Sequence, residues 1–219
     1  LALVSLLVMF GLAIVNLLLV REHVEQSYGL AGWLPGGDPT LGIECVNDHL
    51  ASAMLVAISF LASLCLLYSG SLTPTIGKHR VVPYYTLILL LISALTGIVF
   101  AGDIFNVFVF LEVAALSAYA LVALAGGRAL IAAFRYLILG TLGSTFYLLG
   151  VVFFYATTGT LNMAEMYQQF IASPELLHSR AIVGGMTFLF LGLGIKMALF
   201  PLHAWLPGAY TRAPDAISP

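Results

Sequence analysis

The sequence predicts an all-α membrane protein with about six transmembrane helices, one of which is broken at Pro201. The 219 residues are 61% hydrophobic and only 8% charged, and their mean hydropathy is +1.06. A soluble domain of this length needs far more charge to cover its surface. The apolar residues also occur in runs of about 20, the length at which a helix crosses about 30 Å of hydrocarbon.

Polar or helix-breaking residues separate these apolar runs. We expect the spans at residues 1–20, 49–69, 82–101, 104–125, about 132–157 and 182–206. A polar, acidic loop over 21–47 follows the first span, and a short basic loop from Pro74 to Arg80 follows the second. Asp103 precedes the fourth span, where its carboxylate is expected to cap the exposed N–H groups of the helix.

Smaller features mark the second half of the chain. The fifth span contains Gly140, Gly143 and Ser144, which are small enough to let a neighbouring helix approach closely. Asn162 starts a helix-initiation pattern, which predicts a short surface helix over 163–171.

The ends of the sequence suggest one transmembrane domain within a longer protein. The chain begins inside an apolar run without Met and ends at APDAISP without a closing element. We therefore expect residues 1–219 to be a single domain truncated at both ends. Residues 1–81 would supply the leading helices and the acidic outer loop.

Basic residues collect on one side of the predicted membrane. Alternating the sides places Lys78, Arg80, Arg128, Arg135 and Arg212 together, with Arg21 and Arg180 on the other side. By the positive-inside rule, the first group faces the cytoplasm.

Lys196 is the first candidate for chemistry because it lies about 14 residues into the sixth predicted span. A lysine there costs about 2.5–3.5 kcal/mol on insertion scales. Pro201 removes a backbone hydrogen bond nearby, and Gly192 and Gly194 weaken the same turn. A charged, weakened membrane helix is typical of an intramembrane proton carrier. The alternative is a structural ion pair or a lysine that lines a passive water pocket.

Glu112 is the second intramembrane charge, at a similar depth in the fourth span. Its own helix offers only Ser117 and Tyr119 nearby, so we expect its partner on another helix, and Lys196 is the available cation. A neutral glutamic acid bonded to a backbone carbonyl is the alternative.

Two residues after the proline break have open roles. His203 is either a proton relay between Lys196 and the cytoplasmic side or a hydrogen-bonded anchor. Trp205 is expected to be an interfacial anchor.

The sequence offers no ligand set for a cofactor. Cys45 and Cys65 lack zinc or disulfide spacing and are expected to be packing residues. There are no paired histidines at haem spacing, no phosphate-binding glycine loop and no basic run for nucleic acid. We therefore expect no cofactor, no metal and no nucleic-acid partner.

Three segments resemble a known family. The runs GDIFNVFVFLEVAALSAYALVAL (102–124), GTLNMAEM (159–166) and IKMALFPLHAWLPGAYTRAPDAIS (195–218) are similar to the proton-conducting antiporter-like membrane subunits. That family includes Mrp-type Na⁺/H⁺ antiporter subunits and the related subunits of respiratory complex I and membrane-bound hydrogenases. Within it, the segments look most like the D-type subunits of Mrp antiporters.

The resemblance implies a fold of two inverted five-helix repeats, with 82–219 holding most of the first. It implies that Glu112 and Lys196 form a coupled pair. It also implies other membrane subunits as partners, transport of H⁺ and possibly Na⁺, and a multi-pass location in a bacterial or archaeal inner membrane.

The sequence thus predicts one component of a monovalent cation/proton antiporter, in which Lys196, Glu112 and His203 move protons. One alternative is a proton-pumping subunit of NADH-quinone oxidoreductase (complex I) or of a membrane-bound hydrogenase, which would have no redox centre of its own. Another is a non-conducting membrane scaffold subunit, and a third is a redox protein that contacts quinone.

Overall fold

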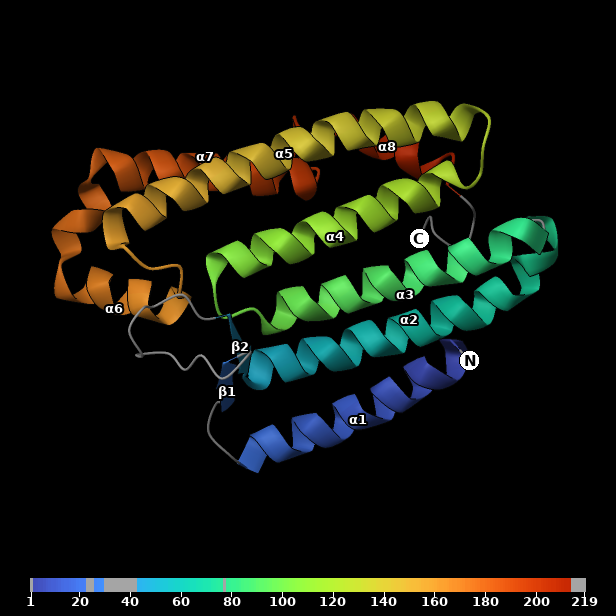
Figure 1. Ribbon diagram of the computed structural model, residues 1–219, viewed down its shortest axis with the longest axis horizontal. Coiled ribbons are helices and arrows are strands. Elements are labelled where there is room, and N and C mark those ends of the chain that lie inside the picture. Colours follow the sequence, from blue (N-terminus) through green and yellow to red (C-terminus); the bar gives the residue numbers. More distant parts are fainter. Residues whose placement is uncertain (1, 23–25, 30–42, 77, 214–219) are drawn as a thin grey trace.

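The computed structural model describes residues 2–22, 26–29, 43–76 and 78–213, and it is almost entirely helical (Figure 1). The α-helices are α1 (Ala2–Glu22), α2 (His49–Ile76), α3 (Lys78–Phe100), α4 (Ile104–Ala123), α5 (Arg128–Thr158), α6 (Met163–Ala172), α7 (Arg180–Lys196) and α8 (Leu206–Tyr210). A short 3₁₀ helix, η2 (Pro174–His178), precedes α7. Two strands, β1 (Gln26–Gly29) and β2 (Glu44–Asn47), pair antiparallel.

The long helices lie side by side in chain order. Each of α1 to α5 packs against the next with its direction reversed, and α7 packs along α5 (Figure 1). The hairpin, α6 and η2 lie at one end of the bundle, and α8 lies at the other. This arrangement places every long helix roughly parallel to one axis.

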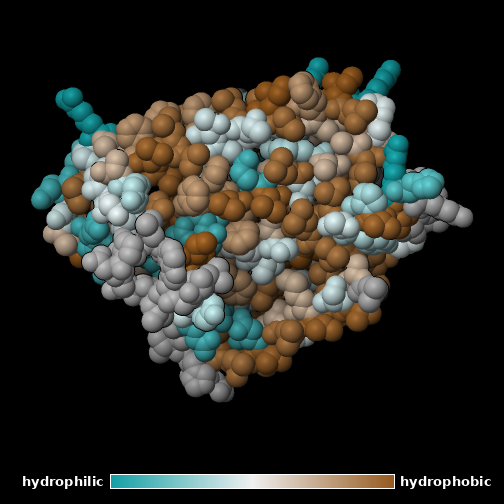
Figure 2. Space-filling model, viewed as in Figure 1, coloured by the Kyte–Doolittle hydropathy of each residue, from teal (hydrophilic) through white to brown (hydrophobic). Residues whose placement is uncertain are grey.

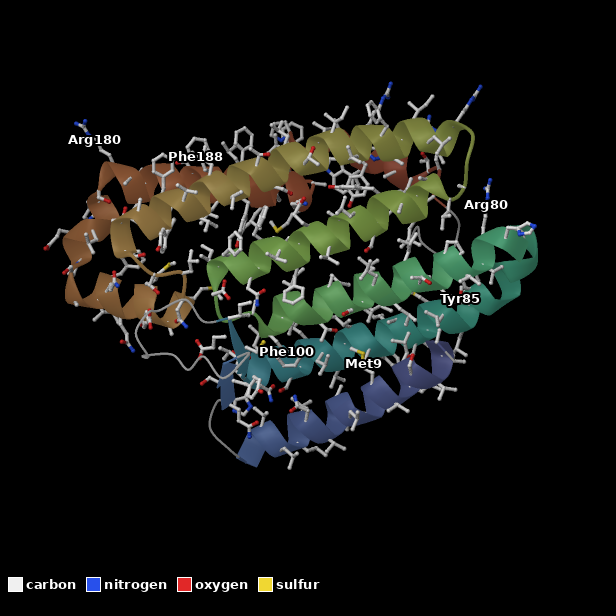
Figure 3. All side chains as sticks on the ribbon, viewed as in Figure 1. Met9, Arg80, Tyr85, Phe100, Arg180 and Phe188 are labelled. Carbon is white, nitrogen blue, oxygen red and sulfur yellow. The ribbon has the colours of Figure 1, made fainter. Side chains whose placement is uncertain are left out.

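The described helices have the length and composition of a membrane protein. Five of them are long and apolar enough to cross a bilayer, namely those from α1 to α5. Figure 2 shows apolar residues across the middle of one face and hydrophilic side chains toward the two ends. Figure 3 places Arg80 at one end and Arg180 at the other. The predicted all-α membrane fold is therefore confirmed.

The sixth predicted span, 182–206, differs from the prediction. Its helix, α7, is 17 residues long and ends at Lys196, and α8 is a separate helix of 5 residues. The intervening residues form turns rather than a kinked helix. The helix therefore breaks directly after Lys196 and before Pro201 is reached.

Two other boundaries also differ from the prediction. The predicted basic loop from Pro74 to Arg80 is largely helical, since α2 runs to Ile76 and α3 begins at Lys78. The predicted loop over 21–47 contains the β1–β2 hairpin. Strands this short give no usable alternation in the sequence, and residues 30–42 of this loop lie outside the described part.

Backbone hydrogen bonds tie three corners together at the hairpin end. The N–H of Gly102 donates to the Glu44 carbonyl at 2.8 Å, and the Gly102 carbonyl accepts from the N–H of Met163 at 3.1 Å. A Cβ at Gly102 would lie 2.9 Å from Val46 Cγ2. The hairpin, the α3–α4 corner and the start of α6 therefore meet at a position that glycine fits best.

Both predicted helix caps are present at this end. Asp103 Oδ1 accepts from the N–H of Asn106 at 2.5 Å, and Asn162 Oδ1 accepts from the N–H groups of Ala164 and Glu165. Burial raises the pKa of Asp103, which is 6% exposed; the N–H groups bonded to its carboxylate oppose this effect and the charge of Glu44 adds to it.

Helices α5 and α7 pack closely against each other. Glycines face each other across it, so a Cβ at Gly192 would lie 2.6 Å from the Gly143 carbonyl oxygen and from the Tyr147 nitrogen. Farther along, a Cβ at Gly150 would lie 2.9 Å from the Gly185 carbonyl oxygen. Small residues at these positions let the two backbones touch, as the sequence predicted for Gly143.

We predict that Asp103→Ala destabilises the protein by about 0.5–2 kcal/mol, because the α4 cap is lost. Below the native pKa of Asp103, where both side chains are neutral, Asp103→Asn should stay within about 0.5 kcal/mol of wild type, since asparagine caps equally well. Burial favours the neutral acid, so wild type should lose stability relative to Asp103→Asn as the pH rises through the native pKa of Asp103. Chemical unfolding of the full-length protein at several pH values measures both effects. Equal stability of the Ala and Asn variants would contradict the capping role.

We predict that Gly192→Ala destabilises the protein by about 1–3 kcal/mol, because the added methyl group meets backbone atoms of α5. Gly184→Ala on the same helix is the matched control. Nothing lies within 4 Å of its Cβ position, and alanine there should be neutral or stabilising. Thermal unfolding of the full-length protein compares the two, and similar behaviour of both variants would show that the close contact is unimportant.

Candidate functional site

Lys196 and Glu112 form an ion pair between α7 and α4. Lys196 Nζ lies 3.0 Å from Glu112 Oε1, and the side chains are 13% and 26% exposed, respectively. Ser144 of α5 donates a hydrogen bond to the same carboxylate oxygen. Side chains from α4, α5 and α7 therefore meet at one carboxylate oxygen.

Glu112 lies in the interior of α4 and Ser144 in the interior of α5. With a rise of about 1.5 Å per residue, Glu112 is about 12 Å from the start of α4 at Ile104. The Gly140 carbonyl oxygen lies 3.0 Å from Ser144 Oγ and is the second acceptor within reach of its single hydroxyl hydrogen. The pair is therefore well inside the apolar part of the bundle, as the sequence predicted.

Lys196 is the last residue of α7 rather than a residue in the middle of a span. Carbonyl groups of the final helical turn accept hydrogen bonds from the turn that follows. The N–H of Met197 donates to the Leu193 carbonyl at 2.7 Å, and the N–H of Leu199 donates to the Gly194 carbonyl at 2.9 Å. The C-terminus of a helix carries a partial negative charge. Lys196 therefore belongs to the negative end of α7, and its ammonium group contacts the Glu112 carboxylate.

The turn after Lys196 ends the helix before the proline is reached. Ala198 has a φ of 52°, a left-handed conformation that costs an alanine energy and cannot continue a right-handed helix. Pro201 lies beyond this residue, within the turn. The sequence therefore predicted a break in the right segment but assigned it to the wrong residue.

Trp205 is buried, so the prediction of an interfacial anchor is wrong. It is 7% exposed, and its Nε1–H donates to the Ile195 carbonyl at 2.9 Å. Its ring stacks on Tyr136, with centroids 4.0 Å apart and planes at 3°. Trp205 is thus a second donor to the Ile195 carbonyl, beside the N–H of Ala198, and it fastens the turn to α5 through its stack on Tyr136.

His203 lies in the same turn, but no hydrogen bond joins it to Lys196 or Glu112 in the described residues. Its ring stacks on Phe200 at 5.6 Å between centroids. Its Nδ1 is buried and has no hydrogen-bonding partner in the part of the chain that the structure describes. The geometry thus brings Lys196 and Glu112 together and leaves His203 apart from them.

Sequence reasoning missed the contact of Ser144 with Glu112, and it placed Tyr119 near Glu112 without predicting that its hydroxyl group is buried. Ser144 was interpreted only as a small packing residue, although its depth in the fifth span matches that of Glu112. Tyr119 lies two helical turns after Glu112 on α4, and its hydroxyl group is buried without a partner in the described residues. It fits only because residue 140 is glycine, since a Cβ there would overlap the hydroxyl oxygen.

The described residues contain no group of three or more His, Cys, Asp or Glu side chains suited to a metal ion. Cys45 and Cys65 are free thiols. The last part of the family-like segment, residues 214–218, lies outside the described range.

Curated relatives come from two kinds of membrane complex. The chain is 44% identical over 91% of its length to the N subunit of NADH-quinone oxidoreductase from Desulforudis audaxviator. It is 32% identical over 88% of its length to the D subunit of the Na⁺/H⁺ antiporter from Bacillus subtilis. The chain spans only 38% of the length of each of these relatives.

Solved structures share the fold over nearly the whole chain. A chain of the membrane-bound sulfane sulfur reductase, an archaeal respiratory membrane complex, matches with a TM-score of 0.83 and 32% identity, covering 99% of this chain and 43% of that one. A chain of the Mrp complex of Dietzia matches with a TM-score of 0.82 and 27% identity, covering 99% of this chain and 39% of that one.

The family described as NADH:quinone oxidoreductase/Mrp antiporter, transmembrane, matches residues 101–219, which include Glu112, Ser144 and Lys196. The predicted resemblance is therefore confirmed: this chain belongs to the transmembrane family shared by NADH:quinone oxidoreductases and Mrp antiporters.

Proposed function

We propose that this chain is part of a membrane subunit that moves protons, with Lys196 as the proton carrier, Glu112 as its charge partner and His203 as a relay. The observation that supports this most is the 3.0 Å ion pair of Lys196 and Glu112 inside an apolar helix bundle. Ionisable residues at such depth are costly and usually functional.

Lys196 is paired with a single acidic group in the described residues, the Glu112 carboxylate. It is also the last residue of α7, directly before the turn that interrupts the helix. A charge that reaches Glu112 therefore acts on the one charged partner of the lysine. A pair held this way suits a group that must both bind and release a proton.

The partner carboxylate offers a way to couple this proton to another charge. A cation that approaches Glu112 competes with Lys196 for the same oxygen, which already accepts from Ser144. The weakened ion pair then favours release of the lysine proton. The coupling is reciprocal, so loading of Lys196 with a proton weakens the site for the cation.

His203 is proposed to pass the proton from the pair toward the basic end of the bundle. It follows the helix break in the sequence, and its Nδ1 has no partner in the described residues. An imidazole can donate and accept protons near neutral pH. Tyr119 follows Glu112 on α4, toward the end at which α4 is joined to α5.

The finer assignment of the complex is also a proposal. We propose a monovalent cation/proton antiporter in a bacterial or archaeal inner membrane, with other membrane subunits as partners and the basic end in the cytoplasm. The relatives named as D subunits of Na⁺/H⁺ antiporters support this. The higher identity to an N subunit of NADH-quinone oxidoreductase, 44%, favours a proton-pumping respiratory complex as the second candidate.

We predict that Lys196→Arg abolishes proton transport while the complex still assembles. An arginine keeps the positive charge beside Glu112 but does not release a proton at physiological pH. Proton flux should fall about a hundredfold or more, the order expected when a positioned proton-transfer group is removed. Glu112→Gln and Lys196→Ala should have similar effects. A pH dye in inverted membrane vesicles that contain the complete complex measures the flux.

Glu175→Gln and Arg180→Gln are the matched controls, since each removes an exposed charge outside the spans. Assembly is checked on native gels. Normal flux in Lys196→Arg would favour the scaffold alternative, in which the pair only fixes helix packing.

We predict that Na⁺ or K⁺ gradients drive proton flux in vesicles of the wild-type complex without any electron donor. In a respiratory complex, flux would instead require an electron donor and a quinone. Lys196→Arg should abolish proton flux in either kind of complex. The variant therefore tests the role of the ion pair, and the requirement for an electron donor tests which complex the chain belongs to. Flux that needs electron transfer would overturn the antiporter assignment and leave the role of the pair intact.

A further inference from the structure

A basic pocket opens between the first turns of α5 and the α8 segment, far from the ion pair along α5. Its volume is about 230 Å³. Three arginines line it, Arg128 and Arg135 from α5 and Arg212 from the residues after α8. Trp205 and Gly208 also contribute to its lining. Because α5 begins here and α8 ends here, the pocket lies at the edge of the apolar band.

The three arginines have no acidic partner among the described residues. The ion pair between Lys196 and Glu112 is the one salt bridge found in the described part of the chain, and no acidic side chain lines the pocket. Another arginine at this end, Arg80, is already used: its Nη1 donates to the Leu124 carbonyl at 2.8 Å. The pocket therefore holds a concentrated positive charge that the described protein does not neutralise.

The three arginines are exposed and line a pocket whose floor is packed structure. The guanidinium of Arg212 lies over Gly208, where a Cβ would be 3.6 Å from Nη1. Trp205 is fixed by its bond to Ile195 and its stack on Tyr136. Gly127, which precedes α5, gives that helix no side-chain cap, so the positive end of the α5 dipole adds to the field of the arginines.

An exposed apolar stripe runs from the pocket along α5. Ile131 lines the pocket and is 59% exposed. Phe134 and Ile138 follow at helical spacing on the same face and are 62% and 48% exposed. A ligand that fills both features must carry a negative charge at one end and hydrocarbon at the other.

We propose that this pocket binds the phosphate headgroup of an anionic phospholipid, whose acyl chain lies along the Ile131–Ile138 stripe. Arginine pairs well with phosphate because its planar group donates two parallel hydrogen bonds. Basic pockets between membrane helices on the cytoplasmic side are suited to anionic headgroups. The lipid would brace the turn that carries Trp205, and through Ile195 it would brace the end of α7 next to Lys196.

The test titrates the purified full-length complex with phosphatidylcholine vesicles that do or do not contain phosphatidylglycerol, and counts bound lipid by native mass spectrometry. Wild type should retain phosphatidylglycerol in preference to phosphatidylcholine. Each of Arg128→Gln, Arg135→Gln and Arg212→Gln should weaken this retention about fivefold. Arg180→Gln, an exposed arginine at the other end, should leave it unchanged. Arg135→Lys should retain more lipid than Arg135→Gln.

Several outcomes would overturn the proposal. Equal retention of both lipids, or retention unaffected by the three substitutions together, would show that protein from elsewhere in the complex fills the pocket. Displacement of the lipid by inorganic phosphate at equal concentration would show a free-anion site instead. If the triple variant fails to assemble, the single variants decide the question, because each leaves two arginines in place.

Discussion

The position of Lys196 depends on the close approach of α5 and α7. Gly143 and Gly192 let the two backbones touch, and this contact brings the end of α7 alongside Ser144. The neighbouring helix α4 then supplies Glu112 to the same site. Larger side chains at the glycines would push α7 outward and draw Lys196 away from Glu112. The positions of Lys196 and Glu112 are therefore determined by packing between apolar helices and not by the electrostatic attraction between the two side chains.

The charged groups are distributed unevenly along the bundle. A single ion pair lies in the interior of the described bundle, while acidic groups such as Glu44 and Asp103 lie at the hairpin end and arginines lie at the opposite end. In the proposed function, a proton that crosses between the ends would pass from acidic surroundings, through the Lys196–Glu112 pair, to basic surroundings. This polarity matches the side-to-side charge bias of the sequence, and it supports the proposed direction of the relay.

The fold class, the spans from α1 to α5 and both polar caps follow from apolar run length and from simple helix-start patterns. The Lys196–Glu112 pair was also predictable, since these residues were the two charges at depth. The end of α7 was not, because the backbone of Ala198 decides it and alanine has no signal for a positive φ. The role of Ser144 was hidden for another reason, since only the α4–α5 register shows which of several small residues faces Glu112. Trp205 was misjudged because a tryptophan near a span end looks the same whether it faces lipid or caps a carbonyl.

The corner at Gly102 has a mechanical consequence. Main-chain hydrogen bonds knit the hairpin, the α3–α4 corner and α6 into one unit at that end, whereas the described contacts at the other end include side-chain links such as Arg80 on Leu124. A single side-chain hydrogen bond breaks and re-forms at a lower cost in free energy than several main-chain hydrogen bonds that join the same elements. The bundle should therefore be stiffer at the acidic end than at the basic end. Helix motions should then separate the helices most at the basic end and least near Gly102.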